Sequence, residues 1–350
     1  MAHIFSEPDG HSRHSWHRLI LVDLFLLALL ILSTRLATFL HELIGHGLTA
    51  VIFGGRLNGI RLTLFGGGNA YYHFQETLTP FPGFLVAFGG ILINLLSGLL
   101  ALRSARAFQS RHSWALFLTL FAMVSLLGGL TYASLGFYYE VGDPVAWMKE
   151  PPPAMDWHWI PFLFASALAA YFGIGRFFRL MQPWHPVRSF PAKAVVLALT
   201  LGVTAGAYAG LYALTRQRSM ALESPSLADM RAQEKIREEK KAAIYSQLKK
   251  AHPEWTDQET RRQVERTPVV VRPEEVPRKP PLILLLALFQ ITGALLALRK
   301  TEEIISPSFS PVSAGALVLS LVLAACVIGF LAWTGGWIYG SSGIMSTGKG

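Results

Sequence analysis

The chain has 350 residues, of which 52% are hydrophobic and only 15% are charged, and its mean hydropathy is +0.39. This composition excludes an ordinary soluble globular protein and favours a membrane protein. The net charge of +9 does not indicate a nucleic-acid-binding protein, because most basic residues flank apolar segments or mix with acidic ones.

About seven apolar segments reach the roughly 20 residues that a helix needs to cross a bilayer. The first starts at Leu19 and extends to Phe53, which is too long for the core of a signal peptide. Cys326 is the single cysteine, so no intrachain disulfide is possible. We therefore predict an α-helical polytopic protein embedded in the lipid bilayer. Its other spans are expected near residues 83–102, 114–138, 158–180, 193–215, 281–298 and 312–334.

The first span contains the stretch FLHELIGHG, in which His41 and His46 lie five residues apart. Zinc-binding HExxH helices place two histidines four residues apart, on one face. Five residues of regular helix leave the side chains roughly 140° apart, but a π-bulge absorbs one extra residue and would bring them together. Gly45 and Gly47 allow the backbone to depart from a regular helix at modest cost.

His41, Glu42 and His46 therefore fall in one six-residue stretch of an apolar segment, where each polar group is costly. Such a cluster favours a metal site. A degenerate site that no longer binds metal and a structural polar cluster are the alternatives.

A hairpin is predicted after the first span. Ile60, Leu62 and Leu64 alternate before the triple glycine at residues 66–68, and a second alternating run begins at Tyr71. The glycines lack the spacing of a nucleotide-binding loop, so two short strands joined by a glycine turn are expected.

Residues 216–280 form the one extended polar segment, between the fifth and sixth spans. A helix is predicted over about 226–250, with Ser226 or Asp229 near its start, and a second helix capped by Thr256 or Asp257 follows it. Its mixed charges indicate a solvated spacer or a docking site for a protein partner, with substrate handling as the alternative.

Two known families resemble this pattern. HELIGH is similar to the HExxGH motif of dipeptidyl peptidase III, a zinc peptidase that binds metal with the longer spacing. The wider order resembles the site-2 protease family of intramembrane metalloproteases over roughly residues 19–150. It comprises the histidine motif, the hairpin GGRLNGIRLTLFGGG, and the span FLVAFGGILINLLSGLL with Gly89, Gly90 and Asn94.

The resemblance implies a third ligand from an aspartate in a later segment. Asp143, in LGFYYEVGDPVAW, is the candidate, although the Leu-Asp-Gly triplet of the family is absent. An aspartate that caps a helix or lies in a solvent turn is the alternative, and Glu140 is then the substitute ligand. It implies that Zn²⁺ is held by His41, His46 and Asp143, with one position left for water. Glu42 would then act as the general base. Asn94 would bind substrate, with interhelical hydrogen bonding as the alternative.

Other polar residues admit simpler interpretations. Arg35 is expected to pair with Glu42, contact a substrate carbonyl, or extend to the membrane surface. His73 is interpreted as a strand-edge residue. His11, His14 and His17 are interpreted as part of a polar leader, with weak metal binding as the alternative.

Orientation is open. Basic residues in short loops place the N-terminus in the cytoplasm, whereas the resemblance, which places the zinc site toward the cytoplasm, requires the opposite. The bacterial cytoplasmic membrane is the expected location.

The sequence thus predicts an intramembrane zinc metalloprotease that hydrolyses peptide bonds of membrane protein or peptide substrates and has no nucleic-acid partner. An inactive relative serving as a membrane scaffold or chaperone, and a metal or proton transporter, are the alternatives. The predicted organisation is a polar leader (1–18), a metalloprotease-like membrane core (19–150), additional membrane helices (151–215), the charged loop (216–280) and C-terminal membrane helices with a tail (281–350).

Overall fold

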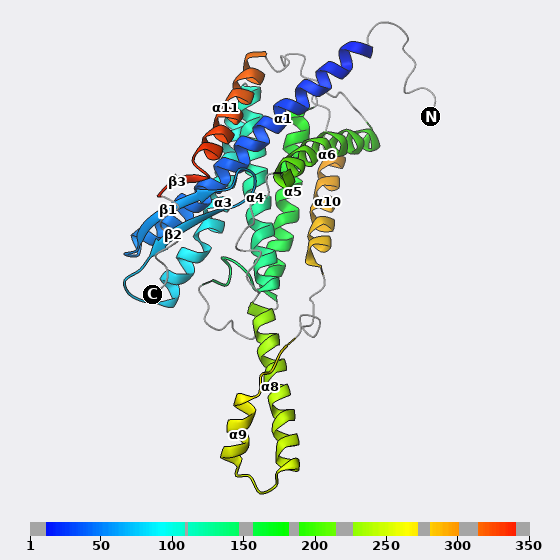
Figure 1. The fold of residues 1–350 in the computed structure, drawn as a ribbon. Helices are drawn as coiled ribbons and strands as arrows, with labels where there is room; N and C mark the ends of the chain where they lie inside the picture. Colours follow the sequence, from blue (N-terminus) through cyan, green and yellow to red (C-terminus); the bar gives the residue numbers. More distant parts are fainter. Residues whose placement is uncertain are drawn as a thin grey trace.

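The computed structural model describes residues 12–108, 111–146, 157–181, 189–214, 227–271, 281–300 and 314–340. Within these residues seven helices are long and apolar enough to cross a membrane, which confirms the predicted fold class (Figure 1). The first span is α1 (Ser12–Leu40), continued without a break by the π-helix η1 (His41–Leu48) and α2 (Thr49–Ile52). The others are α3 (Pro80–Ala107), α4 (His112–Tyr139), α5 (Trp159–Met181), α6 (Phe190–Leu214), α10 (Leu282–Lys300) and α11 (Ala314–Trp333).

Helix α4 is the centre of the bundle. It packs against α3 on one side and α5 on the other, while α1 crosses it and α10 packs against α5. Small and apolar side chains let these helices approach closely, and Ala115, Leu116, Ala122 and Ala133 of α4 are fully buried. The predicted site residues lie in η1, in α3 and just after the end of α4, so the packing of these helices around α4 brings them together.

A small antiparallel sheet follows α2. Strands β1 (Arg56–Leu62) and β2 (Gly68–His73) form the predicted hairpin, and Leu62 pairs with Gly68 next to the glycine turn. The sequence predicted Leu64 in the first strand. This was wrong, because β1 ends at Leu62 and Leu64 belongs to the turn.

A third strand was not predicted. β3 (Trp337–Tyr339) pairs with the other edge of β1, giving the order β2-β1-β3. The chain reverses after α11 through Gly335 and Gly336, whose φ angles of 61° and 89° suit glycine. Since β1 is covered on both sides, β2 carries the free edge on the hairpin side of the sheet.

The charged loop contains the two predicted helices, α8 (Leu227–Ala251) and α9 (Asp257–Arg266). The Thr256 hydroxyl accepts from the Glu259 backbone N–H, and the Glu259 carboxylate accepts from the Thr256 backbone N–H at 2.8 Å, which fixes the start of α9. Ser226 lies outside the described residues. The two helices project from the end of the bundle opposite to the start of α1 (Figure 1). Partner docking by this segment stays a prediction.

Candidate metal centre

The HELIGH motif forms a π-helix. Residues His41–Leu48 adopt this wider helix over eight residues, which extends the single π-bulge expected from the sequence. The Nε2 atoms of His41 and His46 lie 3.2 Å apart, so the wider turn brings the two rings to one side despite their spacing. The π-helix is thus the local structure that makes the five-residue spacing usable.

Two glycines of α3 let that helix touch the motif directly. A Cβ added at Gly89 would lie 2.1 Å from the Gly45 carbonyl oxygen, and one added at Gly90 would lie 2.4 Å from Nε2 of His41. Any side chain at these positions would therefore occupy space that the π-helix and the His41 ring now fill. The glycine pair noted in the sequence therefore leaves the space that the His41 ring occupies.

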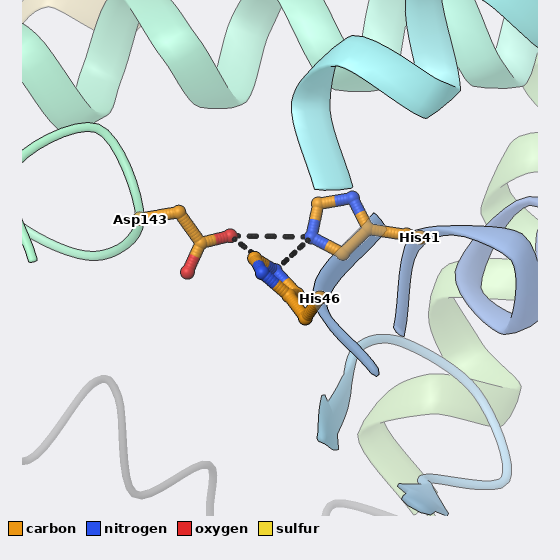
Figure 2. Close-up of side chains that lie close together, drawn as sticks. All are labelled: His41, His46 and Asp143. Carbon is orange, nitrogen blue, oxygen red and sulfur yellow. Dashed lines mark hydrogen bonds and ion pairs between the residues drawn. The ribbon is translucent and has the colours of Figure 1, made fainter. Parts of the chain in front are cut away.

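Asp143 completes a three-residue cluster (Figure 2). Its Oδ2 lies 3.2 Å from Nε2 of His41 and 3.1 Å from Nε2 of His46. The chain turns back toward the histidines after α4 because Glu140 and Gly142 adopt left-handed φ angles of 56° and 67°. Among the described residues, the cluster of potential metal ligands comprises His41, His46 and Asp143, and Glu140 instead caps the end of α4.

These three donor atoms fit a zinc ion. They lie 3.1–3.2 Å from one another, and tetrahedral zinc with bonds of about 2.0–2.1 Å places its donor atoms roughly 3.3–3.4 Å apart. Burial alone would raise the pKa of Asp143, but the hydrogen bonds from the His41 and His46 rings lower it well below its usual value. The carboxylate is therefore ionised, as a metal ligand must be.

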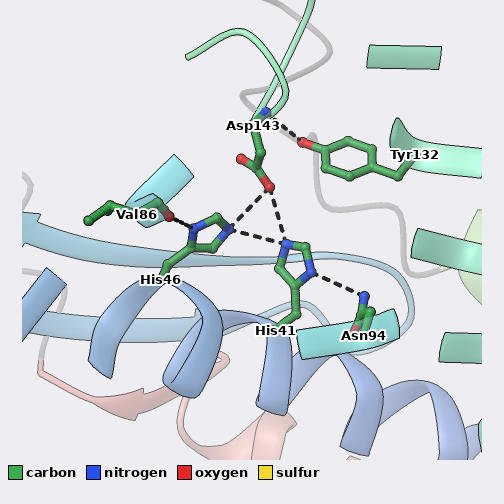
Figure 3. Close-up of polar contacts among 6 residues, drawn as sticks. All are labelled: His41, His46, Val86, Asn94, Tyr132 and Asp143. Carbon is green, nitrogen blue, oxygen red and sulfur yellow. Dashed lines mark hydrogen bonds and ion pairs between the residues drawn. The ribbon is translucent and has the colours of Figure 1, made fainter. Parts of the chain in front are cut away.

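Groups outside the cluster hold the ligands in place (Figure 3). His46 Nδ1 donates to the Val86 carbonyl at 2.8 Å, which leaves its Nε2 lone pair for a metal. The Asn94 amide lies 3.1 Å from Nδ1 of His41. The Asp143 backbone N–H donates to the Tyr132 hydroxyl at 3.2 Å. The ligand set is thus supported from α3 on one side and from α4 on the other.

Glu42 is buried beside the cluster, with 6% of its surface exposed. Its carboxylate accepts a hydrogen bond from the backbone N–H of Ala70 in β2, and it is close enough to His41, His46 and Asp143 to interact with their charges. A Cβ at Gly68 would lie 2.8 Å from Glu42 Cγ, so β2 packs directly over this side chain. The hairpin therefore positions Glu42 next to the three potential ligands.

Arg35 has a role that the sequence did not predict. It is 4% exposed, and its guanidinium donates to the Thr63 carbonyl at 2.7 Å and to the Gly66 carbonyl. A further contact of 3.4 Å reaches the Tyr208 hydroxyl of α6. Of the three expected roles, extension to the membrane surface is wrong, because the guanidinium is buried. Its hydrogen bonds within the described part of the chain go to Thr63, Gly66 and Tyr208 and not to Glu42. Arg35 anchors the turn of the hairpin that covers Glu42.

The other histidines whose side chains the structure describes stay outside the cluster. His73 ends β2 and is exposed, as expected of a strand-edge residue. His11 lies outside the described residues, as do the side chains of His14 and His17.

Sequence reasoning missed Tyr132 and Val86. Tyr132 is a polar-tipped residue inside an apolar span, and Val86 acts through its backbone carbonyl. Neither residue type marks a metal site by itself.

Comparison with protein families gives one match. Residues 16–141 match the family described as Peptidase M50B-like, which confirms the resemblance to the site-2 protease family over that part of the chain. The matched segment includes the HELIGH motif, the hairpin, α3 and α4, and it ends two residues before Asp143. Comparison with curated proteins and with solved structures gives no match.

Proposed function

Since residues 16–141 carry the signature of the site-2 protease family of membrane metalloproteases, we propose that the protein is a zinc endopeptidase that cleaves membrane protein or peptide substrates within the bilayer. The observation that supports zinc most directly is the triangle of His41 Nε2, His46 Nε2 and Asp143 Oδ2, with sides of 3.1–3.2 Å. Two imidazoles and a carboxylate are a common set in catalytic zinc sites and leave a fourth position for water.

We assign the acid–base role to Glu42. When bound, zinc lowers the pKa of a water molecule toward 7 and polarises the substrate carbonyl. Glu42 would take a proton from the attacking water and later deliver it to the leaving amine nitrogen. Its burial, its closeness to the ligands and the N–H of Ala70 fix the carboxylate in one position for both transfers.

The hairpin is the proposed binding site for the substrate backbone. β3 occupies one edge of β1, and β2 presents its own edge on the side that covers Glu42. An extended substrate segment that pairs with β2 would satisfy its backbone hydrogen bonds inside the membrane, where unpaired groups are costly. Helical substrate segments would have to unwind locally before cleavage. Asn94 remains a predicted contact of the substrate.

The proposal is tested with Glu42→Gln. This variant keeps the shape of the side chain but cannot accept a proton. The assay uses proteoliposomes that contain the enzyme and a panel of tagged single-span membrane proteins. The wild type should cleave at least one of these tagged proteins. Glu42→Gln should retain zinc and leave every tagged protein intact. Equal cleavage by both proteins would refute the role of Glu42, and a wild type without zinc would refute the metalloprotease.

A further inference from the structure

Asn94 lies against the ring nitrogen of His41 that faces away from the metal cluster. Its Nδ2 lies 3.1 Å from His41 Nδ1, a contact marked in Figure 3, whereas its Oδ1 is buried and has no hydrogen-bond partner among the described residues. A buried amide oxygen without a partner is costly, and such atoms are few in folded proteins. The contact therefore contains an unexplained feature next to a proposed ligand.

The chemistry of the ring resolves it. A neutral imidazole carries one N–H, and a metal binds the other nitrogen. For His41 to bind zinc through Nε2, which faces Asp143 and His46, its proton must be on Nδ1. An amide NH₂ group opposite that N–H would set two donors against each other. Rotating the amide by 180° exchanges its nitrogen and oxygen with little change in position. Oδ1 then accepts from Nδ1–H, which removes the clash of donors, and the NH₂ group takes the position that Oδ1 held.

We propose that Asn94 is a positioning residue for the metal: its Oδ1 accepts the Nδ1–H of His41 and so holds the Nε2 lone pair toward the cluster. The inference rests on the proposed zinc site and extends it. His46 receives the same support from the Val86 carbonyl at 2.8 Å. Val86 and Asn94 lie two turns apart on α3, on either side of Gly89 and Gly90. One helix thus seats the ring of His41 and orients both histidines.

The proposal is tested by zinc affinity in two variants of similar size. Asn94→Leu removes the acceptor, whereas Asn94→Asp keeps an oxygen in the same place. Zinc dissociation constants are measured in detergent by competition with a chromophoric chelator. We expect Asn94→Leu to weaken zinc binding by about 10- to 100-fold and Asn94→Asp to restore it close to the wild-type value. Ser97→Ala, one turn further along α3, is the matched control and should bind zinc as the wild type does.

Other outcomes would overturn the proposal. Wild-type affinity in both Asn94 variants, with only cleavage reduced, would assign Asn94 to the substrate alone. Equally weakened zinc binding in Asn94→Leu and Asn94→Asp would show that a hydrogen-bond acceptor at position 94 does not support His41. A wild type that binds no zinc in the same titration would refute the proposed function itself, and with it this role.

A second measurement observes the histidine rings directly. In zinc-loaded protein labelled with ¹⁵N-histidine, the ring signals of His41 and His46 are identified as those that change on zinc binding in the wild type and not in His46→Ala or Asp143→Ala. Both should show a protonated Nδ1 and a metal-bound Nε2. A protonated Nε2 at His41 would overturn the assignment.

Discussion

Replacing Gly90 with alanine should displace His41 and abolish tight zinc binding. The added Cβ would lie 2.4, 2.5 and 2.6 Å from Nε2, Cε1 and Cδ2 of the His41 ring, whereas ordinary contacts begin at 3.4 Å. The ring must therefore retreat by about 1 Å, while ligand distances in a metal site tolerate only about ±0.2 Å. His46 and Tyr132 pack against the ring at centroid distances of 4.9 and 6.2 Å, so the retreat is opposed.

We expect Gly90→Ala to weaken zinc binding by at least about 100-fold, which corresponds to about 2.7 kcal/mol. Overpacking should also lower the free energy of unfolding by about 1–3 kcal/mol. Gly128→Ala in α4 is the matched control, because a Cβ there meets nothing within 4 Å. Chelator competition gives the zinc affinity and thermal unfolding gives the stability. If Gly90→Ala bound zinc as tightly as Gly128→Ala, the conclusion that α3 packs directly against the His41 ring would be refuted.

Three further substitutions separate the supporting groups. Arg35→Ala removes the anchor of the hairpin turn, so cleavage should fall by about 10- to 100-fold while zinc content stays unchanged; Arg35→Lys should recover only part of the rate, and full activity of the alanine variant would contradict the role. Tyr132→Phe removes the acceptor of the Asp143 N–H and should weaken zinc binding by about 10-fold in the chelator assay; unchanged affinity would argue against it. Thr256→Ala breaks the capping box and should destabilise α9 by about 1 kcal/mol, seen as faster hydrogen exchange of its amides with no change in zinc affinity; unchanged exchange would contradict the cap.

The membrane fold was predictable because each span is a long apolar run between polar turns. The cap of α9 was narrowed to Thr256 or Asp257, since the capping pattern is local, and the structure shows Thr256. β3 was missed for the opposite reason. A strand of three residues after a span has no pattern of its own and forms because β1 offers it an open edge.

In the candidate site, too, residues close in sequence were predictable and those brought together by packing were not. His41, Glu42 and His46 are adjacent in sequence, and the helical angle between the histidines was enough to predict a wider helix. Asp143 lies 102 residues from His41, so only the family resemblance connected the two. Tyr132 and the Val86 carbonyl could not be foreseen, because their roles depend on how α3 and α4 pack around the cluster.

The most direct test of the central claim is the zinc content of detergent-purified protein, measured by elemental analysis. We predict about one zinc per chain in the wild type and in Glu42→Gln, and its loss in His46→Ala and Asp143→Ala. A wild type that contains no zinc, even after reconstitution with the metal, would contradict the account and favour an inactive membrane scaffold.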